Sequence, residues 1–203
     1  MGTAGFTAAL SVLALDAHGV TPKAGPVAVT GASGGVGSVA VALLADRGFE
    51  VTAATGTPEA HAYLRALGAA EVASRAALAT PPDNPLGPGT WAGAVDSVGG
   101  DTLATLIATT RRHGCVAACG LAGGHELSTT VFPFILRGVA LQGIDSNTAP
   151  RALRERAWAL LADAAAKGAL GAVEKTVIAL EDVPAWAGKI VAGDTRGRVV
   201  VAI

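Results

Sequence analysis

The sequence has few aromatic residues, little charge and almost no cysteine. Its 203 residues include only 3 tryptophans, 1 tyrosine and 4 phenylalanines, and charged residues make up 15% of the chain. The two cysteines cannot build a disulfide framework, and they are too few for a four-ligand structural zinc site. With a formal net charge of −1 and no basic cluster, nucleic acid and anionic membranes are poor partners.

Long hydrophobic runs and targeting segments are also lacking. A membrane helix needs about 18–20 consecutive apolar residues. The strongest apolar window, residues 36–45, is too short and is followed by Asp46. The N-terminus has no basic segment of the kind that begins a secretory signal. We therefore expect a cytoplasmic protein with no membrane partner.

The residues that are abundant are small and apolar. Hydrophobic residues make up 51% of the chain, and 27 residues are glycine. This composition is sufficient for a buried core, and the length predicts one domain or slightly more. A core of small side chains suits closely packed helices and sheet.

Short β-branched runs alternate with longer segments rich in alanine and leucine. This alternation is typical of βαβ units with right-handed crossovers. It predicts a doubly wound parallel sheet, the Rossmann arrangement, within an α/β fold. The expected strands are residues 27–30, 50–54, 70–73, 92–97, 115–119 and 139–144, and the expected helices are 34–47, 58–67 and 101–112.

The two ends of the chain are less typical of such a sheet. The pattern predicts helices at 3–18, 151–167 and 181–192, and strands at 173–180 and 198–203. The last strand is apolar and has no obvious partner in a doubly wound sheet. We divide the chain into a leading helix (1–24), a dinucleotide-binding domain (25–148) and a C-terminal return (149–203). Residues 80–90 contain four prolines and two glycines and are expected to form a surface loop.

The most informative motif is a glycine-rich turn between the first expected strand and helix. Residues 30–38 read TGASGGVGS. Glycines at such a turn allow backbone N–H groups to approach a pyrophosphate, and the helix N-terminus adds partial positive charge. A purely structural glycine turn is the alternative interpretation, but the strand–turn–helix context favours a dinucleotide site.

The turn fits two families of dinucleotide-binding enzymes. Thr30, Gly31, Gly35 and Gly37 match the TGxxxGxG pattern of short-chain dehydrogenases. Those enzymes need a tyrosine with a lysine four residues later, as proton donor and pKa-lowering partner. The single tyrosine, Tyr63, is followed by leucine at that spacing. The alternative is the medium-chain fingerprint, with alanine at its first glycine.

The residues after the second expected strand indicate which dinucleotide binds. An NAD site usually has an Asp or Glu there to hold the ribose hydroxyls, but this stretch reads Thr55-Gly56-Thr57. The two hydroxyls and the Gly56 backbone can donate hydrogen bonds to a 2′-phosphate, and Arg75 can supply charge. NADP is therefore favoured over NAD. Turn formation before a helix that starts at Pro58, and a solvated Arg75, are the structural alternatives.

Together with further segments of the chain, these residues resemble the medium-chain dehydrogenase/reductase superfamily. The resemblance is to its zinc-independent acrylyl-CoA reductase branch, which is similar to quinone oxidoreductases. The later blocks are more specific than the glycine turn, and together they cover nearly the whole chain. The resembling segments are GTAGFTA (2–8), TGASGGVGSVAVALL (30–44), WAGAVDSVGG (91–100), AACGLAGG (117–124), PFILRGV (133–139) and GIDS (143–146).

Members of this branch are about half as long again and begin with a GroES-like catalytic domain. The resemblance therefore implies that this chain is the nucleotide-binding half, and that its last strand normally joins the domain that is missing here. Either the chain is a truncated gene product, or another chain supplies the missing half. The resemblance implies an NADPH-dependent oxidoreductase that reduces the C=C bond of a short α,β-unsaturated acyl-CoA or enone substrate, with hydride delivered to the β-carbon.

The resemblance also assigns binding residues. Ser33, Gly34, Gly35 and Val36 would hold the pyrophosphate; Thr55, Gly56, Thr57 and Arg75 the adenosine phosphate; and Leu121, Ile135 and Ser146 the nicotinamide side. The family often has a basic residue where Thr57 stands, which would weaken NADPH selectivity. Ordinary packing is the alternative for Leu121 and Ile135. No catalytic residue and no metal ligand is assigned, because no proton donor is identified.

Other residues have structural interpretations. Cys115 and Cys119 share a face of an expected strand and are expected to be buried thiols. Asp96 ends a strand and is expected to cap the turn at Gly99. Residues 139–144 would form an apolar edge strand, which favours a homodimer. Two further functions stay open: a non-catalytic NADP-binding module, and a zinc-free quinone or alcohol reductase.

Overall fold

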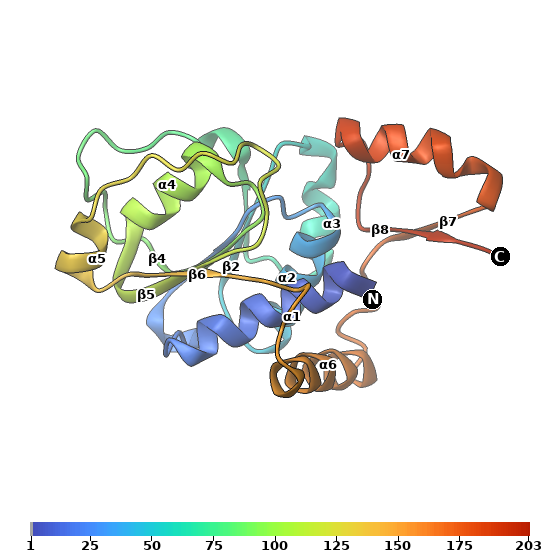
Figure 1. Ribbon diagram of the computed structural model, residues 1–203, viewed down its shortest axis with the longest axis horizontal. Coiled ribbons are helices and arrows are strands. Elements are labelled where there is room, and N and C mark those ends of the chain that lie inside the picture. The colour runs from blue at the N-terminus through green and yellow to red at the C-terminus, as the bar shows by residue number, and fades with distance from the viewer. Residues whose placement is uncertain (1) are drawn as a thin grey trace.

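The centre of the fold is a six-stranded parallel sheet. The computed structural model describes residues 2–203. The strands follow the order β3-β2-β1-β4-β5-β6, and the chain passes from one half of the sheet to the other between β3 and β4 (Figure 1). The strands are β1 (Val27–Val29), β2 (Val51–Thr55), β3 (Glu71–Ser74), β4 (Trp91–Asp96), β5 (Thr110–Ala118) and β6 (Ala140–Gly143). This order confirms the doubly wound Rossmann sheet.

Helices cover both faces of the sheet, as the side chains of the strands require. Val27 and Val29 of β1 pack into one apolar cluster, and Ala28 between them packs into a second. The first cluster lies under α1 (Gly2–Ala17), α2 (Gly35–Asp46), α3 (His61–Ala66) and α6 (Arg151–Ala166). The second lies under α4 (Gly100–Thr109) and α5 (Phe132–Arg137). Short 3-10 turns lie at Pro22–Ala24 (η1), Pro58–Ala60 (η2), Arg75–Leu78 (η3) and Leu180–Asp182 (η4).

The terminal segments join the same core. Phe6 of α1 stacks on Trp158 of α6 with ring centroids 5.5 Å apart. Residues of α1 and α6 also belong to the first apolar cluster, together with those of the sheet. The domain boundaries that we drew after residues 24 and 148 stay predictions.

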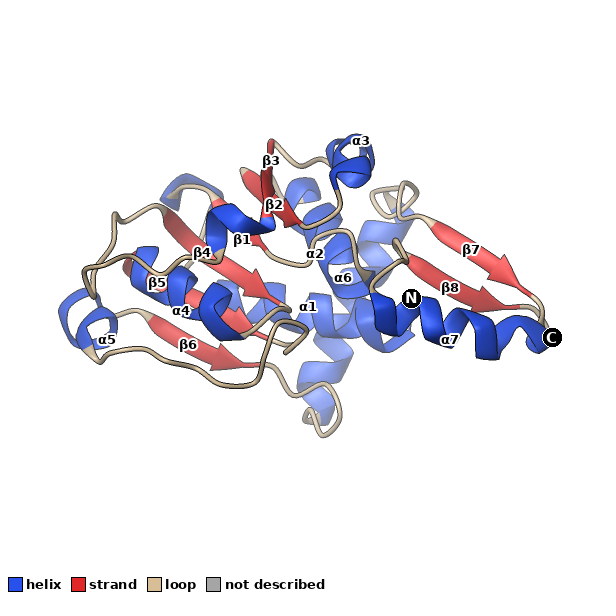
Figure 2. Ribbon diagram, turned by 90° about the horizontal axis from the view of Figure 1, so that it is seen from above, coloured by secondary structure: helices blue, strands red, loops and turns tan. Residues whose placement is uncertain are grey.

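The last strand has a partner outside the main sheet. β8 (Arg198–Val201) pairs in parallel with β7 (Lys175–Ile178), and α7 (Val183–Ala192) connects them. This βαβ unit lies beside the main sheet, beyond the ends of its strands (Figures 1 and 2). The last strand thus has no partner in the main sheet, as expected, and pairs with β7 instead.

Two local predictions also differ from the structure. The helix expected over 101–112 ends at Thr109, because the hydroxyls of Thr109 and Thr110 bond back to helix carbonyls and β5 begins at once. The short helix α5 was not predicted. The loop at 80–90 has no helix or strand and is mostly exposed, as expected. Within residues 2–203, no helix combines the length and apolar character needed to cross a bilayer.

Candidate functional site

The glycine-rich turn lies where β1 ends and α2 begins, at the carboxyl edge of the sheet. Gly34 directly precedes α2, and its N–H donates to the Gly31 carbonyl at 3.0 Å. Gly31 has φ +57°, a left-handed conformation that favours glycine. The first N–H groups of a helix have no partner within that helix. The N–H groups of Gly35 and Val36, which open α2, therefore form a site for an anion.

A buried hydrogen-bond network fixes the turn to the neighbouring strand β4. The Thr30 hydroxyl donates to Asp96 Oδ1 at 2.6 Å, and the Ser97 hydroxyl donates to the Thr30 carbonyl at 2.9 Å. Asp96 also accepts the N–H of Gly99 at 2.8 Å. Burial raises the pKa of the Asp96 carboxyl, and its hydrogen bonds act in the opposite direction. Asp96 caps the turn, as expected, and holds β1 and β4 in register.

Arg198, at the start of β8, lies beside the glycine turn. The N–H of the preceding residue, Gly197, donates to the Ser33 carbonyl at 2.9 Å. A Cβ on Gly35 would lie 2.5 Å from Nη1 of Arg198, so the guanidinium lies directly against the first turn of α2. Among residues 2–203, no carboxylate pairs with Arg198.

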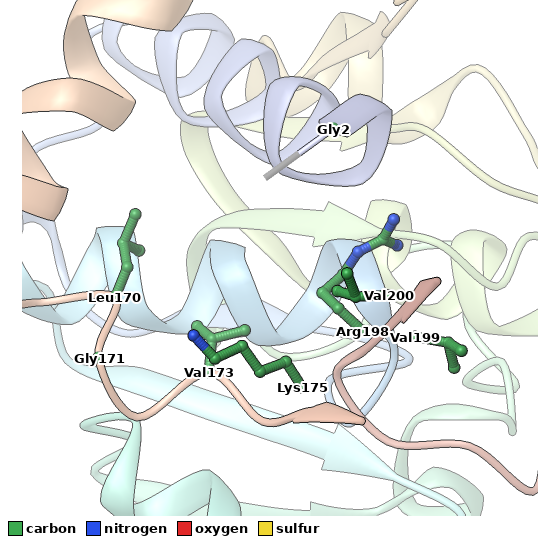
Figure 3. Close-up of a pocket in the computed structure, with 8 residues that line it drawn as sticks. All are labelled: Gly2, Leu170, Gly171, Val173, Lys175, Arg198, Val199 and Val200. Atoms are coloured by element: carbon green, nitrogen blue, oxygen red, sulfur yellow. The ribbon is translucent and has the colours of Figure 1, made fainter. Parts of the chain in front are cut away.

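Arg198 also forms part of the wall of a neighbouring hollow. That hollow has a volume of about 370 Å³ and lies between the β7–β8 pair and the N-terminus of α1. Figure 3 shows the Arg198 side chain extending from β8 toward Gly2. The side chain is half-buried at this place. A half-buried cation without a carboxylate partner, next to a helix N-terminus, is suited to bind an anion.

A second hollow of about 450 Å³ lies beyond the end of β2. Thr55 and Gly56 line it, together with Arg75 from the start of η3. The Arg75 guanidinium lies over Gly56, with Nη2 2.8 Å from where a Cβ would be. Thr55 Oγ1 accepts the N–H of Thr57 at 3.1 Å and lies 3.0 Å from Ser33 Oγ. The structure thus brings Ser33, Thr55, Gly56 and Arg75 together.

Thr57 has a different position from its neighbours. It precedes η2, but its side chain makes no capping hydrogen bond, and it is not among the residues that line the hollow. Its backbone N–H, which bonds to Thr55, fixes the turn instead.

The three residues assigned to the nicotinamide side are not all close together. Leu121 follows the carboxyl end of β5 and Ser146 follows that of β6, and these strands are neighbours. Ile135 lies on α5, which precedes β6 and lies near the amino ends of the strands (Figure 2). Ile135 is 68% exposed. The structure therefore places Leu121 and Ser146 at the edge that holds the glycine turn, and Ile135 away from it.

The cysteines and acidic residues do not form a cluster. Burial raises the pKa of the Cys115 and Cys119 thiols to about 11, so both are protonated at neutral pH. Across residues 2–203, no three His, Cys, Asp or Glu side chains lie close enough to hold one metal ion. Asp145 accepts the N–H groups of Asn147 and Thr148 at 2.8 and 3.0 Å, which is turn formation.

These features fit a dinucleotide phosphate. A cation lies at the helix N-terminus, and a second lies at the end of β2, where no carboxylate stands in the sequence Thr55-Gly56-Thr57. Glycines at positions 35 and 56 keep the space next to each guanidinium free of a side chain.

Comparison with known protein families gives one match that covers more than half of the chain. Residues 35–163 match the model of the zinc-binding dehydrogenase family. The chain belongs to this family. The match confirms the resemblance to the medium-chain dehydrogenase/reductase superfamily.

Individual relatives of the chain are named as reductases. It is 49% identical over 203 residues to acrylyl-CoA reductase AcuI of Ruegeria pomeroyi, and 48% identical over 204 residues to the probable acrylyl-CoA reductase AcuI of Escherichia coli. The comparisons cover 100% of this chain but only 61% and 62% of those proteins. The chain thus spans about three fifths of the length of these curated relatives.

Solved structures show the same fold. The yhdH oxidoreductase of Salmonella enterica, in complex with NADP, superposes with a TM-score of 0.95 at 49% identity over 100% of this chain and 61% of that one. The yhfP protein of Bacillus subtilis, with NAD bound, superposes with a TM-score of 0.93 at 44% identity and the same coverage. These two similar proteins were solved with different dinucleotides.

Sequence reasoning assigned no role to Arg198 or His61. Arg198 precedes the apolar run Val199–Val201, and a lone cation there is a weak signal. Its position beside Gly35 depends on the return of the chain from β7 through α7, which is not visible in the local sequence. His61, the first residue of α3, lines the same hollow as Arg75.

Proposed function

We propose that this chain forms the cofactor-binding part of an NADPH-dependent reductase that saturates the C=C bond of a short α,β-unsaturated acyl-CoA. The observation that carries the cofactor assignment is the pair of cationic side chains along one edge: Arg198 at the N-terminus of α2, and Arg75 over Gly56. The substrate assignment is supported by the two AcuI relatives at 48–49% identity.

The residues of this chain would bind and orient the cofactor. The N–H groups of Gly35 and Val36, with Arg198, would hold the pyrophosphate, and Ser33 would fix the turn through Thr55. Gly34 gives the turn its shape, and Thr57 fixes the loop beside Arg75. Leu121 and Ser146 would lie along the nicotinamide, which supplies the hydride when bound. Orientation and exclusion of water are the contributions of this chain.

The absence of Asp and Glu from residues 55–57 supports NADP over NAD. A fluorescence titration with NADPH and NADH tests this. We expect NADPH to bind at least about tenfold more tightly, because one charge-assisted contact to the 2′-phosphate contributes roughly that factor. Equal affinities would contradict the NADP assignment, and no binding of either cofactor would refute the whole proposal.

A quinone reductase is the second candidate. It is favoured by the 45% identity over 202 residues to the putative quinone oxidoreductase YhfP of Bacillus subtilis. Consumption of NADPH with acrylyl-CoA or with a quinone separates the two. If the chain binds NADPH and consumes it with neither substrate, it acts as a binding module.

We further propose that the chain forms a homodimer through β6. This strand is an edge of the main sheet, and its residues Leu141 to Gly143 are exposed. The other edge strand, β3, carries Glu71, and a charge on an edge discourages pairing. Sedimentation at micromolar concentration should give the mass of a dimer, and Leu141→Lys should give a monomer. A monomeric wild-type chain would count against this interface.

A further inference from the structure

The hollow at the end of β2 contains a second side chain that can become positively charged. Pro58 and His61 form one side of it, and Ser74, Arg75, Ala76 and Ala79 form the other, with Thr55 and Gly56 between them. Among residues 2–203, the lining thus includes two hydroxyls, a guanidinium and an imidazole, but no carboxylate. This donor set is suited to a phosphate monoester.

Arg75 alone leaves such a phosphate incompletely neutralised. A phosphate monoester carries a charge of about −1.5 to −2 near neutral pH, and a guanidinium supplies +1. The hydroxyls contribute hydrogen bonds only, and Thr55 Oγ1 already contacts Ser33 and the Thr57 N–H. Ser74 Oγ accepts the Ala77 N–H at 3.3 Å. His61 is the one lining residue besides Arg75 that can carry positive charge.

We propose that His61 is a second ligand of the 2′-phosphate of NADP and that it contributes to the preference for NADPH over NADH. The inference rests on the proposed cofactor function. An imidazole N–H can donate a hydrogen bond to a phosphate oxygen, as the Arg75 guanidinium can.

The other charged groups near this site act from outside the hollow. Glu59 lies on η2, Arg65 on α3 and Glu71 at the start of β3, and none of them lines the hollow. Arg196 donates to the Glu59 carbonyl at 3.4 Å, and its guanidinium is paired with Glu174. Arg75 and His61 are therefore the two lining residues that can supply positive charge to a phosphate bound in the hollow.

The test is calorimetric titration of the chain with NADPH and with NADH. His61→Ala removes the imidazole, so we expect it to weaken NADPH binding about five- to tenfold and to leave NADH binding unchanged. His61→Lys places an ammonium donor at the same position, so it should retain the NADPH preference of the wild type.

Two controls isolate the contribution of His61. Arg75→Ala should also lower the NADPH preference, because it removes the guanidinium from the same hollow. His18→Ala should change neither affinity, since His18 follows α1 and bonds to the Ala14 carbonyl.

Two outcomes separate this inference from the cofactor assignment. Equal NADPH affinities of the wild type and His61→Ala would overturn the inference while leaving NADPH binding intact. Absence of any NADPH preference in the wild type would instead refute the proposed cofactor.

Discussion

Alanine at position 37 should lower the free energy of unfolding by about 2–3 kcal/mol and weaken NADPH binding by at least about 100-fold. A Cβ on Gly37 would overlap the carbonyl oxygen of Gly31 and lie 2.6 Å from Cα of Ala32. Both neighbours are backbone atoms, so no side-chain rotation relieves the overlap. Either α2 moves away from the turn or the turn opens, and both changes displace the N–H groups of Gly35 and Val36.

Gly188→Ala is the matched control for this substitution. Gly188 lies inside α7, has an ordinary helical conformation, and no atom lies within 4 Å of where its Cβ would be. Alanine there should leave NADPH binding unchanged and leave stability equal or raised by up to about 1 kcal/mol. Chemical unfolding and NADPH titration measure both quantities. A Gly37→Ala variant with the unfolding midpoint and NADPH affinity of the wild type would show that the close approach of α2 to the turn does not matter.

The main sheet could be predicted because its signals are local. Short runs such as Val27–Val29 are separated by glycine turns and by helices of small residues, and each segment specifies its own conformation. The alternation of strand and helix then limits the topology to a few arrangements. For the same reason the glycine turn, Thr55 and Gly56 could be placed at one edge of the sheet from the sequence.

The features that were missed depend on short segments or on distant contacts. Helix α5 has only six residues, although Pro133 near its start and Gly138 in the left-handed conformation after it are both helix-boundary signals. The assignment of Ile135 to the nicotinamide side came from resemblance alone and stays a prediction, and α5 lies near the other end of the sheet (Figure 2). The start of β5 at Thr110 was missed because residues 110–112 were assigned to the preceding helix and the strand was expected only from Cys115.

The pairing of β7 with β8 illustrates a second limit of structure prediction from the sequence. Both strands and the helix between them were expected, and the parallel pair follows the ordinary βαβ rule. However, no local sequence signal indicates that β7 and β8 pair with each other rather than with strands of the main sheet. That choice of partner brings Arg198 to the glycine turn, so the position of this cation depends on tertiary structure.

Replacing Arg198 with glutamine should weaken NADPH and NADH binding equally, by roughly 30-fold each. The pyrophosphate is common to both cofactors, and Arg198 is the cation that lies against the first turn of α2. The effect therefore differs in kind from that of Arg75→Ala, which should reduce only the NADPH affinity. Because Arg198 belongs to none of the ion pairs within residues 2–203, the thermal unfolding midpoint should be little changed.

Lys175→Gln provides the control for lost charge in the same neighbourhood. Lys175 is the register partner of Arg198 on β7 and lines the same hollow, but no contact places it at the glycine turn. If general electrostatic attraction held the cofactor, the two substitutions would weaken binding similarly, and added salt would remove the difference between each variant and the wild type. If Arg198 contacts the pyrophosphate directly, only Arg198→Gln should have a large effect, and this effect should persist at high salt. If the Arg198→Gln variant binds both cofactors like the wild type, then β8 does not contribute to the binding site. The N-terminus of α2 would then be the anion contact at the glycine turn.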